Sequence, residues 1–324
     1  AALNWAWPGL ATLANWPWAS IHPGVHGMMA LVLALVGVAL VAMPRGLPGR
    51  WLAPIFLLPA IIGLRPPAHE IAPGGLRLTV LDVGQGLAVV VRTRRHTLVY
   101  DAGPAYRTGF DAGDAFVVPY LRHVGRTTVD ELMISHSDND HMGGAEAITQ
   151  QLDVRRRSGA DSDHPCRAGQ HWQWDGVDFT MLYPSDDDIE PGMSNNARSC
   201  VLRIDAPGGR VLLPGDIEQA GEQVLVERDA AVLAANVLVV AHHGSASSSS
   251  QPFVTAVAPD IALVSAGWHN RWGFPRPSVV ARYATRDIRL YNTATAGRIR
   301  VAWVSGVLAI RRWRSQAPRF WHTP

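Results

Sequence analysis

Four side chains that can bind a metal ion lie within six consecutive residues of this chain. The segment "ISHSDNDHMGG", residues 134–144, contains His136, Asp138, Asp140 and His141. Imidazole nitrogens and carboxylate oxygens are common ligands of divalent metal ions, and both groups can also transfer protons in catalysis. The density of such groups predicts a catalytic metal site, if the fold brings further ligands to it.

Further ligand-type residues lie at the ends of segments with the apolar pattern of β-strands. "VDELMIS" leads into His136, "RVLLPGD" ends in Asp216, and "VLVVAHHG" ends in His242 and His243. Loops at one edge of a sheet are where a rigid scaffold presents reactive groups. Because ligand-type residues recur at three strand ends, we expect them to form one metal-binding site. Taken alone, Asp216 would also suit the N-cap of a helix that begins at Ile217.

The same part of the chain alternates between strand-like and helix-like patterns. Strands are predicted at "LRLTVLDVG", "LAVVVRT", "HTLVYDAG", "VDELMIS", "VDFTMLYP", "SCVLRID", "RVLLPGD", "VLVVAHHG" and "IALVSAG", and helices at "VVPYLRHVG", 143–152, 217–231 and 277–285. Two strand-rich halves with helices predict an α/β domain with sheets inside and helices outside. The "GQG" of residues 84–86 lacks the third glycine and the following helix of a dinucleotide-binding loop, which excludes a Rossmann site.

The N-terminal part has a different composition. Its first 65 residues carry only three formal charges, all of them arginines. Residues 27–43 form an uncharged run that just reaches the roughly 17–25 residues needed to span a bilayer, and residues 51–64 form a shorter apolar run. One or two transmembrane helices are therefore predicted, with a re-entrant or interfacial second segment as the alternative.

The connector between these two runs sets the predicted topology. Because "PRGLPGR" carries two arginines, the positive-inside rule places it in the cytoplasm and the chain after Leu64 on the outer face. Since the chain starts at Ala1, we expect it to be the C-terminal part of a longer membrane protein. Prolines and glycines mark a boundary near residues 65–75. The predicted parts are a membrane segment at 1–65, a linker at 66–75, the α/β domain with the ligand-type residues at 76–310 and a basic tail at 311–324.

The arginines do not decide whether the chain binds nucleic acid. All 29 basic residues are arginine, which a GC-rich genome explains, and the net charge is only +2. Residues 298–324 hold six arginines and no acid, interleaved with tryptophans, so they could contact phosphates and stack on bases. A solvated or membrane-facing surface is the alternative.

Cys166 and Cys200 form no CxxC pair, which excludes a zinc ribbon. One disulfide and two separate thiols are equally compatible with the sequence.

The order of the motifs resembles a known family. "HSDNDHMGG", "LLPGD" and "AHHGS" resemble the metallo-β-lactamase fold. With "LDVGQGLAVVV", "YDAGP", "VVPYLRHVG", "VAHHGSASSSS" and "HNRWGFPRP", the chain resembles the C-terminal domain of the ComEC/Rec2 DNA-uptake proteins over about residues 76–303. This implies a metallo-β-lactamase-like αββα sandwich, preceded by one or two transmembrane helices from the end of the channel domain.

The resemblance implies two divalent metal ions and assigns their ligands. His136 and Asp138 would hold one ion, and Asp140 and His141 the other; Asp216 would bridge both, and His242 would complete the second site. Asp138, and Asn195 or Asn196, stand where the general fold has histidines. Because oxygen donors replace nitrogen donors at these positions, manganese or magnesium becomes as plausible as zinc.

The implied reaction is phosphodiester hydrolysis. Asp140 would orient the nucleophile or accept its proton, and His243 would donate to a phosphate or leaving oxygen. The predicted substrate contacts are Asn195, Asn196, Gly244, Ser245, His269 and Asn270. The run "GSASSSS" is also typical of a flexible serine linker. Leu87 and Phe274 depart from the family pattern, which has an acidic residue and a histidine there, and both lie outside the main cluster.

The predicted function is that of a metal-dependent nuclease, which degrades one strand of incoming DNA during natural transformation. It would belong to a multi-pass protein of the inner (plasma) membrane, with the hydrolase domain on the extracytoplasmic side. The implied partners are DNA, the membrane and other competence-machinery proteins, and a homo-oligomer is left open. Two alternatives are a hydrolase of a small phosphodiester, since this fold serves many chemistries, and a non-catalytic DNA-guiding domain.

Overall fold

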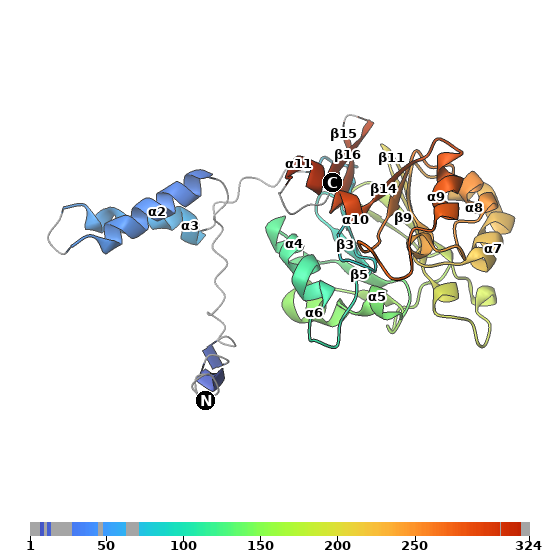
Figure 1. Cartoon of the computed structure of the whole chain (residues 1–324), viewed down its shortest axis with the longest axis horizontal. Helices are drawn as coiled ribbons and strands as arrows, with labels where there is room; N and C mark the ends of the chain where they lie inside the picture. The colour runs from blue at the N-terminus through green and yellow to red at the C-terminus, as the bar shows by residue number, and fades with distance from the viewer. Residues whose placement is uncertain are drawn as a thin grey trace. The chain divides into compact units, whose positions relative to one another are not determined.

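The chain consists of two compact units, 1–69 and 70–324. The computed structural model describes residues 7–9, 12–13, 28–44, 48–62, 71–304 and 306–318 (Figure 1). In the first unit, helix α2 (Met28–Ala42) and helix α3 (Ala53–Ile62) are joined through the short turn η1 (Arg50–Leu52). A Cβ on Gly37 of α2 would lie 2.7 Å from Leu57 Cγ of α3, so the glycine allows the two helices to approach closely.

The predicted transmembrane helices are not confirmed. Helix α2 has 15 residues and α3 has 10. Within the described ranges, no helix is both long and apolar enough to cross a membrane. Arg45 of the predicted cytoplasmic connector and residues 66–70 of the predicted linker lie outside those ranges.

The second unit contains two seven-stranded sheets. The first has the order β16-β15-β1-β2-β3-β5-β7; β3, β5 and β7 are parallel and the other neighbours antiparallel. Its strands are β1 (Arg77–Val80), β2 (Val89–Arg92), β3 (Thr97–Tyr100), β5 (Glu131–Ile134), β7 (Arg157–Gly159), β15 (Ile299–Val304) and β16 (Val307–Arg312). Strands β4 (Thr128–Val129) and β6 (Asp153–Val154) form a separate pair.

The second sheet has the order β14-β13-β12-β11-β10-β9-β8, antiparallel from β8 to β11 and parallel from β11 to β14. Its strands are β8 (His171–Trp174), β9 (Val177–Tyr183), β10 (Val201–Ala206), β11 (Gly209–Leu213), β12 (Val237–Val239), β13 (Ile261–Val264) and β14 (Arg289–Asn292).

Helices cover the outer faces of both sheets (Figure 1). The helices on the first sheet are η2 (Gly113–Val117), α4 (Val118–His123), α5 (Asn139–Met142) and α6 (Ala145–Gln151). Those on the second are α7 (Gln219–Asp229), α8 (Gln251–Val257) and α9 (Pro277–Ala284). Shorter segments are η3 (Asp186–Asp188), η4 (Asn196–Arg198), η5 (Ala230–Leu233), η6 (Ala241–Gly244), α10 (Thr293–Ala296) and α11 (Trp313–Gln316).

Apolar strands buried on both faces explain these layers. Because alternate residues of a strand point to opposite faces, Val89 and Val91 of β2 enter the core between the sheets, while Val90 packs under the helices of the first sheet. In β12, Val237 and Val239 face the same central core, and Leu238 packs under the helices of the second sheet. The predicted αββα sandwich is confirmed. Strand β16 and helix α11 extend the ordered elements to Gln316, beyond residue 310.

Candidate metal centre

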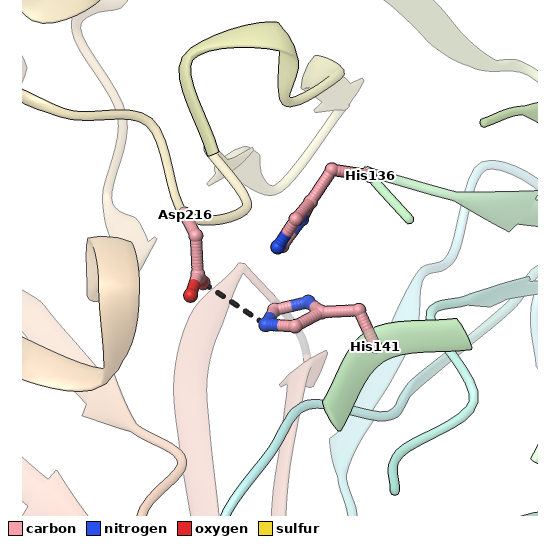
Figure 2. Close-up of side chains that lie close together, drawn as sticks. All are labelled: His136, His141 and Asp216. Carbon is pink, nitrogen blue, oxygen red and sulfur yellow. Dashed lines mark ion pairs between the residues drawn. The ribbon is translucent and has the colours of Figure 1, made fainter. Parts of the chain in front are cut away.

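Two groups of ligand-type side chains meet where strands of both sheets end. One group is His136, His141 and Asp216, and the other is Asp140, His141 and His243; within each group the ligand atoms lie within 4.8 Å of one another. They follow β5, β11 and β12 or lie in the short helix α5. Figure 2 shows His136, His141 and Asp216 converging on a common space.

Asp216 is the centre of this cluster. Its Oδ1 lies 3.2 Å from His141 Nε2, and its Oδ2 lies 3.4 Å from His243 Nε2. His243 Nε2 is also 3.3 Å from Asp140 Oδ2 and 3.2 Å from His141 Nε2. The rings and carboxylates therefore share one polar space instead of forming separate pairs.

The pKa values of the side chains in this buried cluster depend on their contacts with one another. Burial alone would raise the pKa of Asp216, but His141 and His243 hold it well below its usual value. Burial would lower the pKa of His141, yet Asp216 and Asp101 raise it well above its usual value. The pKa of His136 is lowered, first by burial and then by the neighbouring His141. Anionic carboxylates thus lie beside a neutral His136.

The second nitrogen of each buried ring is held by a group behind the cluster. Asp101 Oδ2 lies 2.7 Å from His141 Nδ1, and its two oxygens also accept hydrogen bonds from the backbone N–H and hydroxyl of Ser135. The carbonyl oxygen of Ser265 lies 2.8 Å from His243 Nδ1. With Nδ1 engaged in this way, the Nε2 atoms of both rings are directed into the cluster.

The sequence analysis did not assign roles to Asp101, Ser135 or Ser265. The available signal was "VYDAG", in which a buried strand ends in an aspartate just as "LLPGD" does. Asp101 is fully buried and has a positive φ of 61°. Such a backbone conformation in a non-glycine residue is a strain that functional sites often carry.

Two buried polar atoms near the centre fit a metal ion. His136 Nε2 and Asn196 Oδ1 have no hydrogen-bond partner among the described residues. A buried acceptor without a partner costs free energy, and coordination of a cation would remove that cost. Imidazoles and carboxylates are ligands of divalent metal ions, so the residues present fit the divalent cations, manganese, zinc or magnesium, that the resemblance implies.

His242 and His243 lie at different places although they are neighbours in sequence. Both have positive φ angles, 48° and 54°. His243 is buried in the cluster, whereas His242 Nε2 lies 3.9 Å from Asp216 Oδ2 and belongs to neither ligand group. His242 Nδ1 lies 3.3 Å from the hydroxyl of Ser247.

Asp138 lies at the rim of the centre. Its side chain is 43% exposed, and its Oδ2 is 3.7 Å from His136 Nε2. Asn195 Nδ2 donates to Asp138 Oδ1 at 2.8 Å. Asn196 Nδ2 lies 3.4 Å from His242 Nε2. The two asparagines therefore line the side of the centre that includes Asp138 and His242.

The capping alternative for Asp216 is wrong. Helix α7 begins at Gln219 and its N-cap is Glu218, whose side chain makes no capping hydrogen bond. Gly215 has a φ of 57°, and a Cβ there would lie 3.0 Å from the Cβ atoms of Ser135 and Ser199. The glycine thus permits the tight turn that directs Asp216 into the cluster instead of along the helix.

The serine run after His243 is a packed segment, not a flexible linker. Ser245, Ser248 and Ser249 are buried. The buried carboxylate of Glu222 in α7 accepts hydrogen bonds from the backbone N–H groups of Ser249 and Ser250, at 2.6 and 2.7 Å. The hydroxyl of Ser245 lies 3.1 Å from that of Ser247. Gly244 lies against Pro275, where a Cβ would be 2.5 Å from Pro275 Cβ.

Two other predicted substrate contacts lie on the loop before α9. His269 is exposed and stacks on Trp268 with ring centroids 4.7 Å apart. Asn270 uses its amide within the loop, donating to the carbonyls of Gly267 and Phe274 and accepting from the N–H of Phe274. Phe274 lies edge-on to His242, at 5.8 Å between centroids.

Leu87, the other departure from the family pattern, supports the centre through its backbone. Its side chain is buried in the core between the sheets. Its N–H donates to the carbonyl of Asp140 at 3.0 Å, and its carbonyl accepts from the N–H of Gly103 at 2.8 Å. The backbone at this position therefore holds the segment that carries Asp140.

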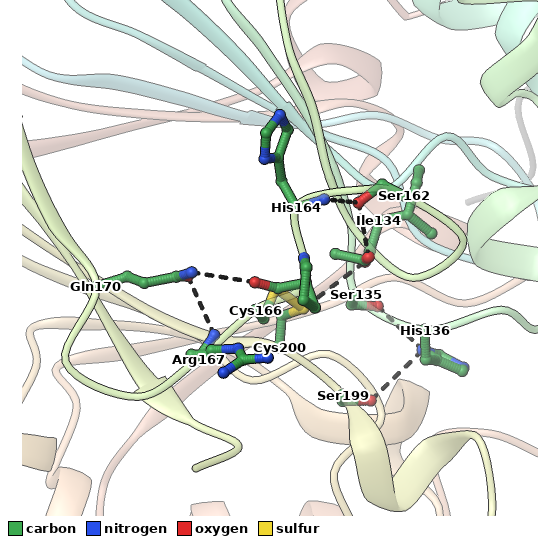
Figure 3. The surroundings of a disulfide bond; sticks show 12 residues. Ile134, Ser135, His136, Ser162, His164, Cys166, Arg167, Gln170, Ser199 and Cys200 are labelled. Carbon is green, nitrogen blue, oxygen red and sulfur yellow. Dashed lines mark hydrogen bonds between the residues drawn. A yellow bond between two sulfur atoms is a disulfide. The ribbon is translucent and has the colours of Figure 1, made fainter. Parts of the chain in front are cut away.

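A disulfide joins Cys166 and Cys200, with Cα atoms 5.7 Å apart. Figure 3 shows it beside Ser135, which precedes His136. Both cysteines line a cavity of about 210 Å³ together with His136, Asn195 and Arg198. The disulfide thus forms part of a wall next to the candidate metal centre.

The basic C-terminal segment is partly engaged within the fold. Arg298 lies over the ring of Trp313 at 4.4 Å and over that of Tyr120 at 5.3 Å. Arg314 Nη2 forms an ion pair with Asp82 Oδ2 at 2.7 Å. Residues 319–324, which include Trp321, lie outside the described ranges.

Comparisons with known proteins agree with this architecture. The family model described as "Metallo-beta-lactamase superfamily" matches residues 81–268. Competence protein ComA of Neisseria gonorrhoeae is 37% identical over 293 residues, covering 88% of this chain and 40% of that protein. Recombination protein 2 of Haemophilus influenzae is 34% identical, covering 74% of this chain and 30% of that protein. ComE operon protein 3 of Bacillus subtilis is 27% identical, with 70% and 33% covered. The chain spans less than half the length of these curated relatives.

Proposed function

The chain belongs to the metallo-beta-lactamase superfamily and fits the ComEC/Rec2 family within it, and from that premise we propose that unit 70–324 is a metal-dependent deoxyribonuclease. It would hydrolyse one strand of incoming DNA during natural transformation. The relatives carry competence and recombination names, which supports DNA as the substrate.

The observation that carries this proposal is the convergence of buried ligands around Asp216. Three histidines and two carboxylates meet there, and one buried imidazole nitrogen, His136 Nε2, has no hydrogen-bond partner within the described residues; its nearest carboxylate, that of Asp138, is 3.7 Å away. A purely structural ion-pair cluster would pair each of its polar atoms. An arrangement with an unused buried acceptor fits a centre built around a cation.

The geometry supports one change to the sequence-based ligand set. His136, Asp138 and Asp216 would hold one ion, with Asn196 Oδ1 as a further oxygen donor. Asp140, His141, His243 and Asp216 would hold the other, with His243 taking the role that the sequence analysis gave to His242. Two divalent cations, manganese, zinc or magnesium, would supply Lewis-acid activation of water and of the phosphate.

The chain's own residues would position and transfer the protons. The carboxylate of Asp140 is held ionised: burial opposes its charge, but the contact with His243 lowers its pKa. As an anion it can orient a water molecule for attack. His242 lies outside both ligand groups, with its Nδ1 3.3 Å from the hydroxyl of Ser247. In its protonated form it would displace the Asn196 amide, which lies 3.4 Å from Nε2, and donate from Nε2 to the leaving oxygen.

We also propose that the domain lies on the extracytoplasmic side of the inner (plasma) membrane, as part of a multi-pass protein. The Cys166–Cys200 disulfide supports this location, because disulfides persist in oxidising compartments. Exposed apolar side chains on α2 and α3, among them Met29, Leu35 and Ile55, support contact with lipid or with further helices. The proposed partners are therefore DNA, the membrane and other competence-machinery proteins.

The test is cleavage of end-labelled linear DNA by the purified full chain. Manganese, magnesium and zinc would each be added to metal-free protein, and bound metal would be measured in parallel. We expect metal-dependent degradation, and a loss on the order of 100-fold or more in Asp140→Asn. The matched control is Asp163→Asn, since Asp163 is exposed and forms no ion pair among the described residues.

The outcomes separate the proposal from its alternatives. Cleavage of small phosphodiesters without cleavage of DNA would show that the substrate is a small phosphodiester and not DNA. A folded chain that binds no metal and cleaves neither class would contradict a hydrolase and favour a DNA-guiding domain. Equal losses in Asp140→Asn and Asp163→Asn would contradict the assignment of activity to this centre.

A further inference from the structure

A loop rich in aromatic residues lies beside the candidate metal centre. We name residues 267–276, between β13 and α9, the aromatic loop. It contacts the segment after β12 at three neighbouring residues: Phe274 lies edge-on to His242, Pro275 packs against Gly244, and the N–H of Arg276 donates to the carbonyl of Gly244 at 2.9 Å. Gly244 directly follows His243, so the loop adjoins the segment that carries both histidines.

The aromatic rings form a row that begins at His242. Trp272 stacks on Phe274, with centroids 6.4 Å apart and planes 19° apart. The guanidinium of Arg271 lies 4.3 Å above the ring of Trp272. Trp268 is 47% exposed and Trp272 is 40% exposed, so both keep accessible ring surface.

The loop is held in this conformation by its own hydrogen bonds. Asn270 Nδ2 donates to the carbonyls of Gly267 and Phe274, and its Oδ1 accepts from the N–H of Phe274. The N–H of Gly267 donates to Gln85 Oε1 at 3.3 Å. Two large indoles are thus fixed at the surface, each with close to half of its surface open to solvent. Such pre-organised aromatic groups reduce the entropy lost on binding a partner.

The charge of the loop indicates the partner. Arg271 and Arg276 contact aromatic rings but have no carboxylate partner within the described part of the chain. Unpaired cations next to exposed aromatic faces match a polyanion that also presents flat rings. A nucleic-acid strand has this chemistry, but its bases are accessible for stacking only where they are unpaired.

We infer that the aromatic loop is a stacking platform for the bases of an unpaired DNA strand, with Trp268 and Trp272 as the platform and Arg271 and Arg276 as phosphate contacts. The inference rests on the proposed function and names its substrate class. A strand bound there would have its adjoining phosphate at the metal centre, because the row of rings ends at His242. Asn270 is then a positioning residue of the loop, not a substrate contact.

Binding without cleavage tests this inference. The purified full chain would be titrated, in excess chelator, against a fluorescent single-stranded oligothymidine, an abasic oligonucleotide of the same length and a duplex closed at both ends. We expect oligothymidine to bind most tightly. Trp272→Ala should weaken oligothymidine binding roughly 5- to 100-fold and leave abasic binding unchanged. Trp272→Phe, which keeps an aromatic face, should retain most of the binding.

Trp313→Ala is the matched control. Trp313 is also 47% exposed and carries an arginine, Arg298, 4.4 Å above its ring, but it lies in α11. Because Arg298 and Arg314 engage this segment within the fold, we expect Trp313→Ala to leave oligothymidine binding unchanged, against the sequence-based alternative that residues 298–324 stack on bases. The inference is overturned if Trp313→Ala and Trp272→Ala cause equal losses, if oligothymidine and abasic binding fall together, or if the closed duplex binds as tightly as oligothymidine.

The same preparations distinguish this inference from the proposed function. Base-dependent binding without metal-dependent cleavage would support the aromatic loop and contradict the nuclease. Suppose that cleavage is lost in Asp140→Asn but that Trp268→Ala and Trp272→Ala leave oligothymidine binding unchanged. This result would support the nuclease and contradict the role given to the aromatic loop.

Discussion

Asp101 fixes the orientation of the ring that belongs to both ligand groups. Its Oδ2 lies 2.7 Å from His141 Nδ1, which leaves His141 Nε2 facing Asp216 and His243. Two hydrogen bonds from Ser135 hold the carboxylate itself in place. A carboxylate behind a ligating imidazole fixes its tautomer and raises its basicity. The affinity of the centre for a cation should therefore depend on a residue that does not touch the cation.

Replacing Asp101 by asparagine should weaken metal binding about 10- to 100-fold. Asparagine keeps the shape of the side chain and tolerates the positive φ of 61° at this position, so the backbone should be retained. Calorimetric titration of metal-free protein with manganese or zinc would measure the affinity. Unchanged affinity in a variant whose unfolding free energy is also unchanged would contradict the role given to Asp101.

At the scale of elements, the strand ends could be predicted from sequence because the pattern is local. Apolar runs in segments such as "VDELMIS" and "RVLLPGD" predict buried strands, and the polar residues that end them predict the edge of the sheet. The choice between His242 and His243 could not be made in this way. Both residues have left-handed backbone conformations, so the alternation of an extended strand no longer says which ring points inward.

Elements with weak local patterns were missed for a related reason. Strand β8, "HWQW", alternates exposed and half-buried residues at the edge of its sheet, and the hairpin β15–β16 is rich in arginine. Their positions depend on pairing with strands distant in sequence, for example β15 with β1. Tertiary contacts of this kind leave little trace in a sequence window.

One such contact joins the two sheets at their turns. Asp175, between β8 and β9, accepts hydrogen bonds from the hydroxyl of Thr93, from the backbone N–H and Nε of Arg95, and its Oδ2 lies 3.1 Å from His96 Nδ1. These three partners belong to the turn between β2 and β3. Although burial opposes its charge, the hydrogen bond from Thr93 and those from Arg95 hold the pKa of Asp175 well below its usual value.

Asp175→Asn should therefore destabilise the domain in a pH-dependent manner. Because the folded pKa lies below the unfolded value of about 3.9, the carboxylate contributes stability above that pH and loses it as the pH falls further. We expect a loss of about 1–3 kcal/mol in unfolding free energy at pH 7, shrinking below about pH 4. Urea unfolding of both proteins at pH 7, 5 and 3 measures the difference. A constant difference across this range would contradict the argument.

At the scale of the whole molecule, the disulfide bears on the compartment of unit 70–324. Cys166 and Cys200 are 34 residues apart in sequence and both are buried. Closing a loop of this length stabilises the native state by about 3–4 kcal/mol in the chain-entropy model, but only where thiols are oxidised. The disulfide therefore adds stability to the fold only in an oxidising compartment, such as the extracytoplasmic side proposed above.

A thiol introduced at Asp187 should react from outside the cell. Asp187 is exposed and has no ion pair among the described residues, and the native cysteines are bonded to each other, so Asp187→Cys supplies a single reactive thiol. In spheroplasts that express the chain, a membrane-impermeant maleimide should label this variant as completely as it does after permeabilisation. The unsubstituted chain is the control and should stay unlabelled until a reductant is added. Labelling of Asp187→Cys only after permeabilisation would place unit 70–324 in the cytoplasm, and the proposed nuclease could then not meet DNA before its entry.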